Sequence, residues 1–333
     1  MSTSELPVAS VLPALTTALE ETRRAVLTAP PGAGKTTLVP LALIEAGVPG
    51  RIVMLEPRRL AARAAAARMA QLRGEELGAT VGYRIRGEAK TSAATRIEVV
   101  TEGVLTRMIQ SDPSLEGVGA VIFDEFHERS IHADLGLALA LEAQAALRED
   151  LRLLVMSATL DADPIATLMG GALVIRSEGR AHPVSVIWAE TSWRARPGAR
   201  LETAVAALIR RAYAEESGDI LAFLPGEGEI RRTAAALGDI GADADIRPLY
   251  GAMRLADQRA ALEPAPAGRR KIALATSIAE TSLTVEGVRI VVDAGLARRA
   301  RFDPGSGMSR LVTEKASRAE AAQRAGRAGR QSP

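Results

Sequence analysis

Residues 24–37 of this 333-residue chain have the sequence RAVLTAPPGAGKTT, in which a short apolar run leads into a loop of small residues. The apolar run predicts a strand, and the loop opens into a predicted helix. Such a loop binds phosphate, because backbone N–H groups and the positive end of the helix point toward the anion. We expect Lys35 to reach the β- and γ-phosphates of a nucleotide and Thr36 to bind Mg²⁺, whereas an ordinary glycine-rich turn is the alternative. Ala29 stands where the usual first glycine of such a loop would be. The predicted nucleotide-binding residues of the loop are Ala29, Pro30, Pro31, Gly32, Ala33, Gly34, Lys35, Thr36 and Thr37.

Apolar strands and helical segments alternate along the whole chain. The runs RIVMLEP, RIEVV, AVIFDE and RLLVMSA occupy the first half, and DILAFLP, IRPLY, KIALAT and RIVVDAG the second. Helical patterns separate them, for example at 201–216 and 230–237. This alternation predicts an α/β fold with mainly parallel sheets, and the length predicts two domains in series. A Gly/Arg/His/Pro segment at 179–183 places the expected boundary between residues 1–180 and 181–333.

The composition is that of a globular protein, with 47% hydrophobic and 25% charged residues. The formal net charge is only +2, so net charge by itself does not predict a nucleic-acid partner. The chain has no cysteine, which excludes disulfides and thiolate metal sites, and its three histidines are too scattered for a histidine metal cluster. It shows neither a secretory leader nor an apolar stretch of bilayer length. We therefore expect a soluble cytoplasmic protein with no membrane partner.

An acidic motif, DEFH at residues 124–127, follows the apolar run 120–123. Downstream of a phosphate loop, an acidic pair at a strand end binds metal and activates water. We expect Asp124 to hold Mg²⁺ and Glu125 to orient and help deprotonate the attacking water. An isolated acidic pair is usually a helix cap or a solvated surface, but the phosphate loop upstream favours catalysis here.

The sequence QRAGRAGR at residues 323–330 is rich in arginine and glycine. If the segment is helical, Gln323, Arg327 and Arg330 share one face. The two glycines lower its helix propensity, which a purely structural helix would have little reason to accept. Arginines aimed at a transferring phosphate are therefore favoured over a solvated basic helix.

Together these motifs resemble superfamily 2 helicases of the DEAH/RHA type, and in detail the bacterial HrpB family. Phe126, where most DEAH proteins have alanine, is a variant similar to that of the HrpB family. The resemblance implies two tandem RecA-like domains, an ATP-binding domain at 1–180 and a helicase C-terminal core at 181–333, with ATP and Mg²⁺ bound. The motifs that carry it after the phosphate loop are EPRRLAAR (56–63), TEGVL (101–105), DEFHERS (124–130), SATLD (157–161), FLPGEGEI (223–230), PLYGAM (248–253), ATSIAETSLTVEGV (275–288) and QRAGRAGR (323–330).

The resemblance implies roles for residues of both domains in hydrolysis. Gln323 would help to position the attacking water, and Arg327 and Arg330 would act as arginine fingers. Because one chain supplies these arginines, a monomer would suffice. The residues implied in coupling the nucleotide site to domain movement are His127, Ser157 and Thr159. Taken alone, Ser157-Ala158-Thr159 would be an ordinary helix cap and turn.

Recognition of the base rests on the resemblance alone. Arg68 matches a position that packs on the adenine in DEAH relatives. Leu262 falls where several relatives place an aromatic residue against the other face of the base, a departure that would weaken discrimination among nucleotides. Thr284 and Glu286 lie where a further motif meets the nucleotide, although relatives commonly have aspartate at the second of these positions.

The implied nucleic-acid contacts go to sugar and phosphate, which suits a motor that moves along any sequence. For the two arginines among them, the alternative is that they belong to a solvated helix face, like most Arg-Arg pairs. The segment 296–312 resembles the β-hairpin with which DEAH proteins separate strands, and an ordinary surface loop is its alternative. The matched contact positions are Arg58, Arg59, Thr101 and Thr276.

These features predict an ATP-dependent RNA helicase motor, with RNA favoured over DNA by the resemblance alone. ATP binding would close the two domains on a single strand, and hydrolysis would reopen them. One alternative is a nucleotide-dependent clamp with little unwinding, since DEAH relatives continue into accessory C-terminal domains. A P-loop ATPase that moves protein is a further alternative, against which the helicase motifs argue.

Overall fold

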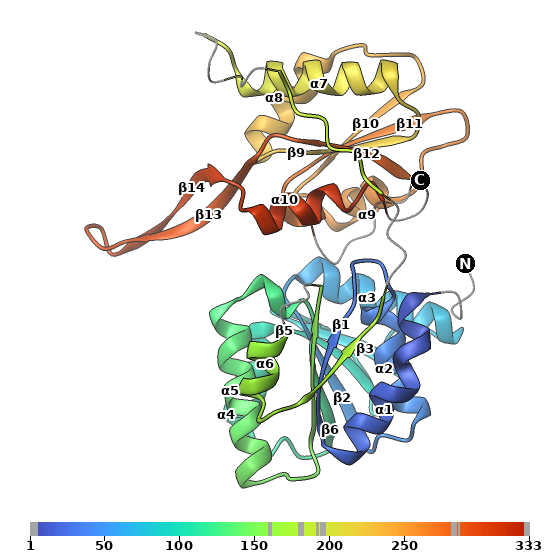
Figure 1. Ribbon diagram of the computed structural model, residues 1–333, viewed down its shortest axis with the longest axis vertical. Helices are drawn as coiled ribbons and strands as arrows, with labels where there is room; N and C mark the ends of the chain where they lie inside the picture. Colours follow the sequence, from blue (N-terminus) through green and yellow to red (C-terminus); the bar gives the residue numbers. More distant parts are fainter. Residues whose placement is uncertain are drawn as a thin grey trace. The chain divides into compact units, whose positions relative to one another are not determined.

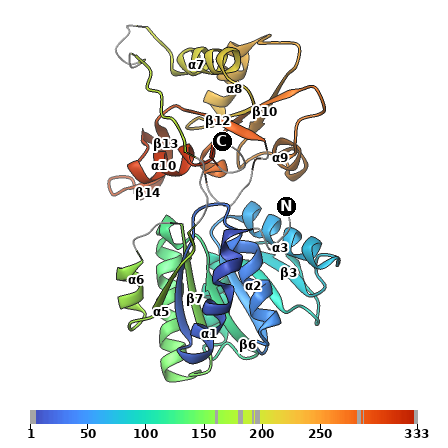
Figure 2. The ribbon, with the colours of Figure 1, turned by 45° about the vertical axis from the view of Figure 1, so that its right-hand side comes forward.

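The computed structural model describes residues 6–158, 162–178, 183–190, 193, 198–280, 285 and 287–329. Contacts between Cα atoms divide the chain into two compact units, Met1–Arg180 and Ala181–Pro333. Within each unit, helices cover both faces of a mainly parallel sheet (Figures 1 and 2). The prediction of an α/β fold with mainly parallel sheets is confirmed.

Unit 1 contains an eight-stranded sheet within the described residues, in the order β4-β3-β5-β2-β6-β7-β1-β8. All pairs are parallel except that β4 is antiparallel to β3. Its strands are β1 Arg24–Thr28, β2 Arg51–Glu56, β3 Val81–Ile85, β4 Glu88–Lys90, β5 Ile97–Thr101, β6 Val118–Phe123, β7 Arg152–Ser157 and β8 Leu173–Arg176. Its helices are η2 Pro7–Val11, α1 Leu12–Glu21, α2 Lys35–Glu45, α3 Arg59–Arg73, α4 Glu102–Ser111, η3 Phe126–Glu128, α5 Ile131–Ala146 and α6 Asp163–Leu168.

Two apolar layers sandwich this sheet because successive side chains of a strand point to opposite faces. In β2, Ile52 and Met54 join the layer under α1, α2 and α3, whereas Val53 and Leu55 join the layer under α4, α5 and α6. Figure 1 shows the two groups of helices on opposite sides of the sheet. Each fully buried side chain of this size contributes about 1.5–3 kcal/mol to folding. The sheet is therefore a rigid support for the loops at its edges.

Unit 2 contains a four-stranded parallel sheet within the described residues, in the order β10-β11-β9-β12. In β11, Ile272 and Leu274 face the layer under α7 and α8, and Ala273 and Ala275 face the layer that includes α9 and η5. The elements of this sheet and its cover are α7 Leu201–Glu215, β9 Asp219–Phe223, α8 Glu227–Leu237, β10 Ala244–Leu249, α9 Leu255–Leu262, β11 Arg270–Ala275, η5 Ser277–Ala279 and β12 Val288–Asp293.

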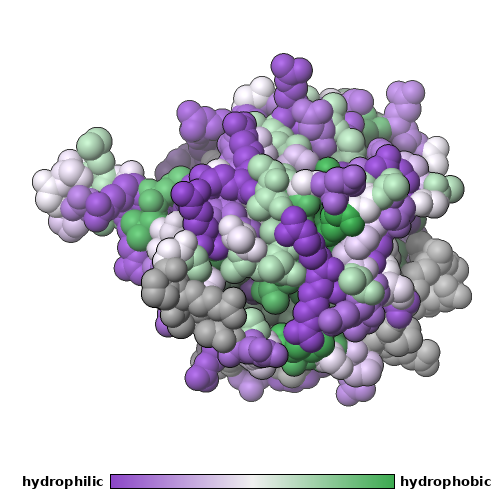
Figure 3. All heavy atoms as spheres, turned by 90° about the horizontal axis from the view of Figure 1, so that it is seen from above, coloured by the Kyte–Doolittle hydropathy of each residue, from purple (hydrophilic) through white to green (hydrophobic). Residues whose placement is uncertain are grey.

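An antiparallel hairpin, β13 Leu296–Asp303 and β14 Met308–Lys315, follows β12 and leads to α10, Arg318–Ala325. The predicted hairpin at 296–312 is thus confirmed as a structure. It stands out from unit 2 with hydrophilic and apolar side chains on its surface (Figure 3). The hairpin strands expose three apolar side chains by 65–68%, those of Phe302, Met308 and Leu311.

The helices in the described part of the chain are shorter or more polar than a bilayer-spanning helix. Among them, no helix is both long enough and apolar enough to cross a membrane.

Candidate active site

The predicted catalytic residues of unit 1 lie at one edge of its sheet. The strands β2, β6, β7 and β1 are consecutive neighbours and run parallel, so their carboxyl ends meet at the same edge. Thr28, at the end of β1, pairs in register with Ser157, at the end of β7. In open α/β sheets, ligands bind beyond the carboxyl ends of the strands.

The phosphate loop connects β1 to α2 in this position. Its glycines Gly32 and Gly34 have φ of 84° and 91°, a region that residues with a Cβ rarely adopt. A Cβ on Gly34 would lie 2.9 Å from Cδ1 of Leu6, a contact that the leucine side chain could relieve, so the positive φ is the main reason for glycine here. Ala29 is buried, which shows that a small side chain at this position is compatible with the loop.

Lys35 begins α2 with a side chain that is almost fully buried. Its Nζ donates a hydrogen bond to Oε1 of Glu125 at 3.1 Å. Burial would lower the pKa of Lys35, but the carboxylates of Glu125 and Asp124 outweigh burial and raise it. The loop therefore presents a charged ammonium group to its ligand.

Asp124 lies directly opposite the start of α2. Its Oδ2 accepts a hydrogen bond from the Thr36 hydroxyl at 2.5 Å, and its Oδ1 accepts one from the Glu125 N–H at 2.8 Å. Burial is the main reason that the pKa of Asp124 is raised to about 6, against the lowering effect of Lys35. Two oxygen donors side by side fit a hard cation such as Mg²⁺, which fills its remaining positions with water and substrate phosphates.

His127 connects this motif to the end of β7. Its Nδ1 accepts a hydrogen bond from the Ala158 N–H at 3.2 Å. Because Nδ1 acts as an acceptor, its 3.5 Å approach to Oε2 of Glu125 is not an ion pair. Burial lowers the pKa of His127 and favours the neutral ring with its proton on Nε2. A direct contact between the DEFH and SAT motifs thus exists within unit 1.

Phe126, the unusual residue of the motif, belongs to the core. It is 2% exposed and packs edge-on against Phe123, with ring centroids 6.2 Å apart. The preceding Glu125 has φ of 50°, a strained region for a non-glycine residue, and buried Phe126 helps to hold the backbone there.

Glu56 is a buried acid of this site that the sequence interpretation did not single out. It ends β2, is fully buried, and neither carboxyl oxygen has a hydrogen-bond partner among the described residues. Burial and the nearby carboxylates of Asp124 and Glu125 raise its pKa well above the usual range. The sequence pattern that led to Asp124, an acid at the end of an apolar strand, is also present at Glu56.

The predicted nucleic-acid contacts of unit 1 lie at the starts of two helices that follow neighbouring strands and cover opposite faces of the sheet. Arg58 is the N-cap residue of α3, and Thr101 is that of α4. The two helices follow β2 and β5, which pair with Glu56 opposite Thr101. Arg58 also pairs with Glu128 at 3.3 Å, and Arg59 donates to the carbonyl of Arg86 at 3.4 Å.

The two positions considered for contact with the base lie in different units, Arg68 in unit 1 and Leu262 in unit 2. Arg68 is exposed on α3, where its Nη1 donates to Oε1 of Gln71 at 2.8 Å. Leu262, at the end of α9, is partly buried and packs against the core of unit 2. Packing therefore accounts for an apolar residue at this position without reference to a base.

The expected helical face of the last motif, QRAGRAGR, required a helix that continues through Arg327. In the described part of this motif the helix ends at Ala325. Helix α10 begins with a capping box at Ser317 and ends at Ala325, with Gly326 as its C-cap. Arg327 lies in the following turn, so a helical face common to it and Gln323 is not formed. The glycines at 326 and 329 explain this ending, since glycine costs about 1 kcal/mol relative to alanine within a helix.

Arg327 and Gln323 nevertheless both lie near the end of α10 in unit 2. Arg327 is 3% exposed, and its Nε donates to the carbonyl oxygen of Glu280 at 3.0 Å. Gln323 is partly exposed on the helix. Thr276 is the N-cap residue of η5 after β11, without a side-chain capping bond, and its N–H donates to the carbonyl oxygen of Leu249 at 3.1 Å. Four predicted residues, Thr159, Thr284, Glu286 and Arg330, lie outside the described part of the chain.

Arg324 is the residue of this motif to which the sequence interpretation gave no role. Its side chain is 1% exposed. Its Nη1 donates to Oδ1 of Asp293 at 2.8 Å and to the carbonyl oxygen of Leu296 at 3.2 Å. It also lies 3.5 Å from Glu280 and 5.1 Å from the centre of the Phe223 ring. Arg324 therefore ties the end of α10 to β9, β12 and the segment before residue 281. Sequence periodicity carries no signal for such a network, because its partners lie far apart in the chain.

Comparison with protein families gives matches to both halves of the chain. The DEAD/DEAH box helicase model matches residues 10–168, and the helicase conserved C-terminal domain model matches residues 202–332.

Individual relatives match over almost the whole chain. This chain is 54% identical to the ATP-dependent RNA helicase HrpB of Escherichia coli K12, and the match covers 99% of this chain and 40% of that protein. It is 37% identical to the human ATP-dependent RNA helicase DHX33, with 98% and 48% covered. The crystal structure of Escherichia coli DEAH/RHA helicase HrpB superposes with a TM-score of 0.90 and 53% identity, covering 99% of this chain and 42% of that one. The chain thus spans less than half the length of these relatives.

Proposed function

Because the chain belongs to the DEAD/DEAH-box helicases, we propose that it is the motor core of an ATP-dependent RNA helicase. The observation that carries this proposal is the joining of the phosphate loop to the acidic motif through Lys35–Glu125 and Thr36–Asp124. Two relatives, HrpB and DHX33, are named as RNA helicases, which supports RNA as the nucleic acid. The reaction would be hydrolysis of ATP to ADP and phosphate, coupled to movement on the strand.

In this proposal Lys35 changes partner when ATP binds. It now pairs with Glu125, and the β- and γ-phosphates of ATP would compete for the same ammonium group. The carboxylate of Glu125 would then be able to accept a proton from water as the water oxygen bonds to the γ-phosphorus. The bond from that phosphorus to the bridging oxygen breaks, and ADP leaves with the electron pair.

Mg²⁺ would be held by the Thr36 hydroxyl and Asp124, directly or through water. Support comes from Asp124 itself, since a buried carboxylate with a pKa raised to about 6 is poorly compensated and gains from a cation. When bound, the metal would neutralise charge on the phosphate oxygens.

Residues of unit 2 would act in the ATP-bound state. Gln323 would orient the water, and Arg327 and Arg330 would stabilise the charge of the transferring phosphoryl group. Arg327 now donates to a backbone carbonyl, a neutral acceptor that a phosphate oxygen could replace with gain of charge pairing. His127, Ser157 and Thr159 would couple this step to movement between the units.

The nucleic-acid strand would bind across the starts of α3 and α4. Neighbouring helix N-termini favour anions, and Arg58, Arg59 and Thr101 add donors for phosphate and sugar oxygens. Thr276 would provide a second grip in unit 2, so that opening and closing change the spacing between the grips.

The test is steady-state ATP hydrolysis with single-stranded RNA, with single-stranded DNA and without nucleic acid. We expect stimulation by RNA, and a loss of about 10²–10⁴-fold in Glu125→Gln, which removes the proton acceptor. Glu142→Gln, the same exchange at an exposed position of α5, should leave the rate unchanged. Equal turnover in all three conditions would contradict the motor. Hydrolysis without displacement of a paired strand would instead support the clamp.

A further inference from the structure

The segment 125–130 joins the candidate active site to the start of α5. It begins at Glu125, whose Oε1 accepts from Lys35 at 3.1 Å, and it ends at Ser130, the N-cap residue of α5. Glu125 and Arg129 have φ of 50° and 51°, a left-handed region that is costly for residues with a side chain. A backbone in this region keeps its conformation only where its surroundings hold it. The contacts of the segment therefore bear on the position of Glu125.

Ser130 ties this segment to α4. Its hydroxyl donates to Oε2 of Glu102, the first residue of α4, at 2.6 Å. The same oxygen accepts from the N–H groups of His132 and Ala133 at 3.1 and 3.2 Å. Burial raises the pKa of Glu102, and the hydrogen bond from Ser130 opposes that rise. Glu102 directly follows Thr101, a proposed contact to the nucleic-acid strand, so this bond connects the strand site to the segment.

Glu128 ties the same segment to α3. Its Oε2 lies 3.3 Å from Nη2 of Arg58, the N-cap residue of α3 and another proposed strand contact. A phosphate oxygen bound at Arg58 would compete with Glu128 for the guanidinium group. After that exchange the bond between Ser130 and Glu102 would still hold the segment to α4. The two ties therefore differ, since strand binding weakens one and leaves the other.

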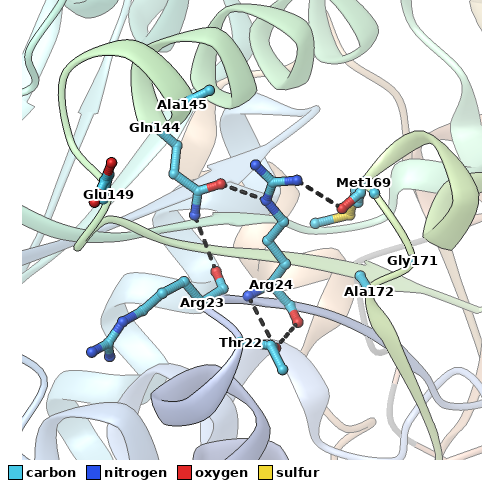
Figure 4. Close-up of a pocket in the computed structure, with 10 residues that line it drawn as sticks. Thr22, Arg23, Arg24, Gln144, Ala145, Glu149, Met169, Gly171 and Ala172 are labelled. Carbon is cyan, nitrogen blue, oxygen red and sulfur yellow. Dashed lines mark hydrogen bonds between the residues drawn. The ribbon is translucent and has the colours of Figure 1, made fainter.

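The other end of α5 is fixed to the sheet. The amide of Gln144 donates to the carbonyl oxygens of Arg23 and Leu151 at 3.3 and 2.5 Å, and its Oε1 accepts from Nε of Arg24 at 2.6 Å. Figure 4 shows Gln144 joined to both arginines, with which it lines a cavity of about 360 Å³. Because α5 is held here, a displacement at the start of α4 would act on the segment 125–130 through Ser130 instead of sliding the whole helix.

A purely structural explanation is that the bond between Ser130 and Glu102 holds α4 against α5. Apolar packing already provides that contact further along the two helices, where Leu105 and Leu137 belong to one buried layer. A Cβ on Gly136 would lie 3.4 Å from Cδ2 of Leu105, so the helices approach closely there. The polar bond lies instead at the sheet edge where strand and nucleotide are proposed to bind. Its position favours a role in coupling.

We propose that Ser130 and Glu102 are positioning residues that couple the binding of a nucleic-acid strand to catalysis by Glu125. This inference rests on the proposed helicase function. A strand bound at Thr101 fixes the start of α4, and the bond from Ser130 then fixes the segment that begins with Glu125. Without a strand, the contact of Glu128 with α3 holds the segment as well, so hydrolysis without nucleic acid depends less on Ser130.

The test compares ATP hydrolysis at saturating single-stranded RNA with hydrolysis without RNA. Ser130→Asp keeps an N-cap acceptor for α5 but replaces the hydroxyl donor with a carboxylate that repels Glu102. We expect it to lower kcat with RNA by about tenfold, because a hydrogen bond to a charged group is lost, and the rate without RNA by less than about threefold. The RNA concentration for half-maximal stimulation should change by less than about twofold. Ser130→Thr, which keeps the hydroxyl, should keep the stimulated rate.

Ser111→Asp is the matched control, the same exchange at the exposed far end of α4, and it should leave both rates within about twofold of the original chain. If Ser130→Asp does not fold, Glu102→Ala removes the same bond from its other side, with Glu142→Ala at an exposed position of α5 as its control. A stimulated rate equal to that of the controls, or a parallel fall of both rates, would overturn the inference alone. An original chain that RNA does not stimulate would contradict the proposed function as well.

Discussion

Lys35 in unit 1 and Arg324 in unit 2 are both buried cations, 3% and 1% exposed, but their surroundings differ. Lys35 lies among buried acids, and burial favours their protonated form. The pKa of Asp124 is raised to about 6, and that of Glu56 is raised well above its usual range. Arg324 is held by Asp293, Glu280, a backbone carbonyl and the face of Phe223. The first arrangement has more acids than cations, whereas in the second the charge of Arg324 is paired with two acids of its own unit and its Nε is left without a hydrogen-bond partner among the described residues.

This difference indicates different purposes for the two cations. A site whose acids are poorly compensated is prepared for a ligand, and its charges are expected to rearrange when the ligand arrives. A buried network whose cation is paired with two acids instead fixes the positions of the segments that it joins, here the end of α10 and the turn with Arg327. Exchanging each cation for methionine should therefore affect nucleotide binding in one case and folding in the other.

The largest effect is expected for Arg324→Met. Removing one partner of a buried ion network leaves Glu280 and Asp293 uncompensated, which costs about 3–5 kcal/mol. Chemical denaturation should show this loss in the transition of unit 2, and Arg324→Lys should recover part of it. A variant as stable as the original chain would show that the network contributes no net stability.

Lys35→Met should weaken nucleotide binding by about 10–100-fold, corresponding to roughly 1.5–3 kcal/mol for a lost charged hydrogen bond. The free energy of unfolding should change by less than in Arg324→Met, because the acids around Lys35 can take up protons. Fluorescent nucleotide titration and denaturation of the same sample measure both quantities. A large loss of stability with unchanged affinity would reverse the comparison.

The raised pKa of Asp124 predicts how stability depends on pH. The folded state keeps this proton up to about pH 6, whereas the unfolded chain releases it near the ordinary value of 3.8. Stability from this group is therefore greatest below about pH 4 and is lost as pH rises through about 6. Relative to Asp124→Asn, the original chain should lose roughly 1–2 kcal/mol between pH 5 and 7. A difference that stays constant with pH, measured by denaturation, would show that Asp124 is ionised throughout.

The smallest effect is expected for the half-buried pair between Arg58 and Glu128. Pairs of this kind contribute about 0–1 kcal/mol, so Glu128→Gln should strengthen RNA binding by about two- to fivefold as Arg58 loses a competing partner. Fluorescence anisotropy with labelled RNA measures this change. Glu116→Gln, at an exposed position of the same unit, is the control and should bind RNA as the original chain does. Weaker binding in Glu128→Gln would contradict competition for Arg58.

The sequence predicted the features whose signals are local. An apolar strand followed by a loop of small residues placed Lys35 and Thr36 at the start of a helix, and the same kind of strand placed Asp124 at a sheet edge. The eight motifs indicated the DEAD/DEAH family, which the family models confirm. The hairpin at 296–312 was predicted from the resemblance to DEAH proteins, with a surface loop as the alternative, and the structure shows it as β13 and β14.

Only the tertiary structure decided which distant side chains meet. Arg324 reaches partners 31 and 44 positions earlier, and Glu56 comes close to Asp124 because β2 and β6 are neighbours in the sheet. It also decided that α10 ends at Ala325, and that Arg23 and Arg24 line a cavity with Gln144, 120 positions after Arg24. Local pattern specifies strands, helices and turns, whereas burial and charge compensation depend on packing between elements that no short stretch of sequence contains.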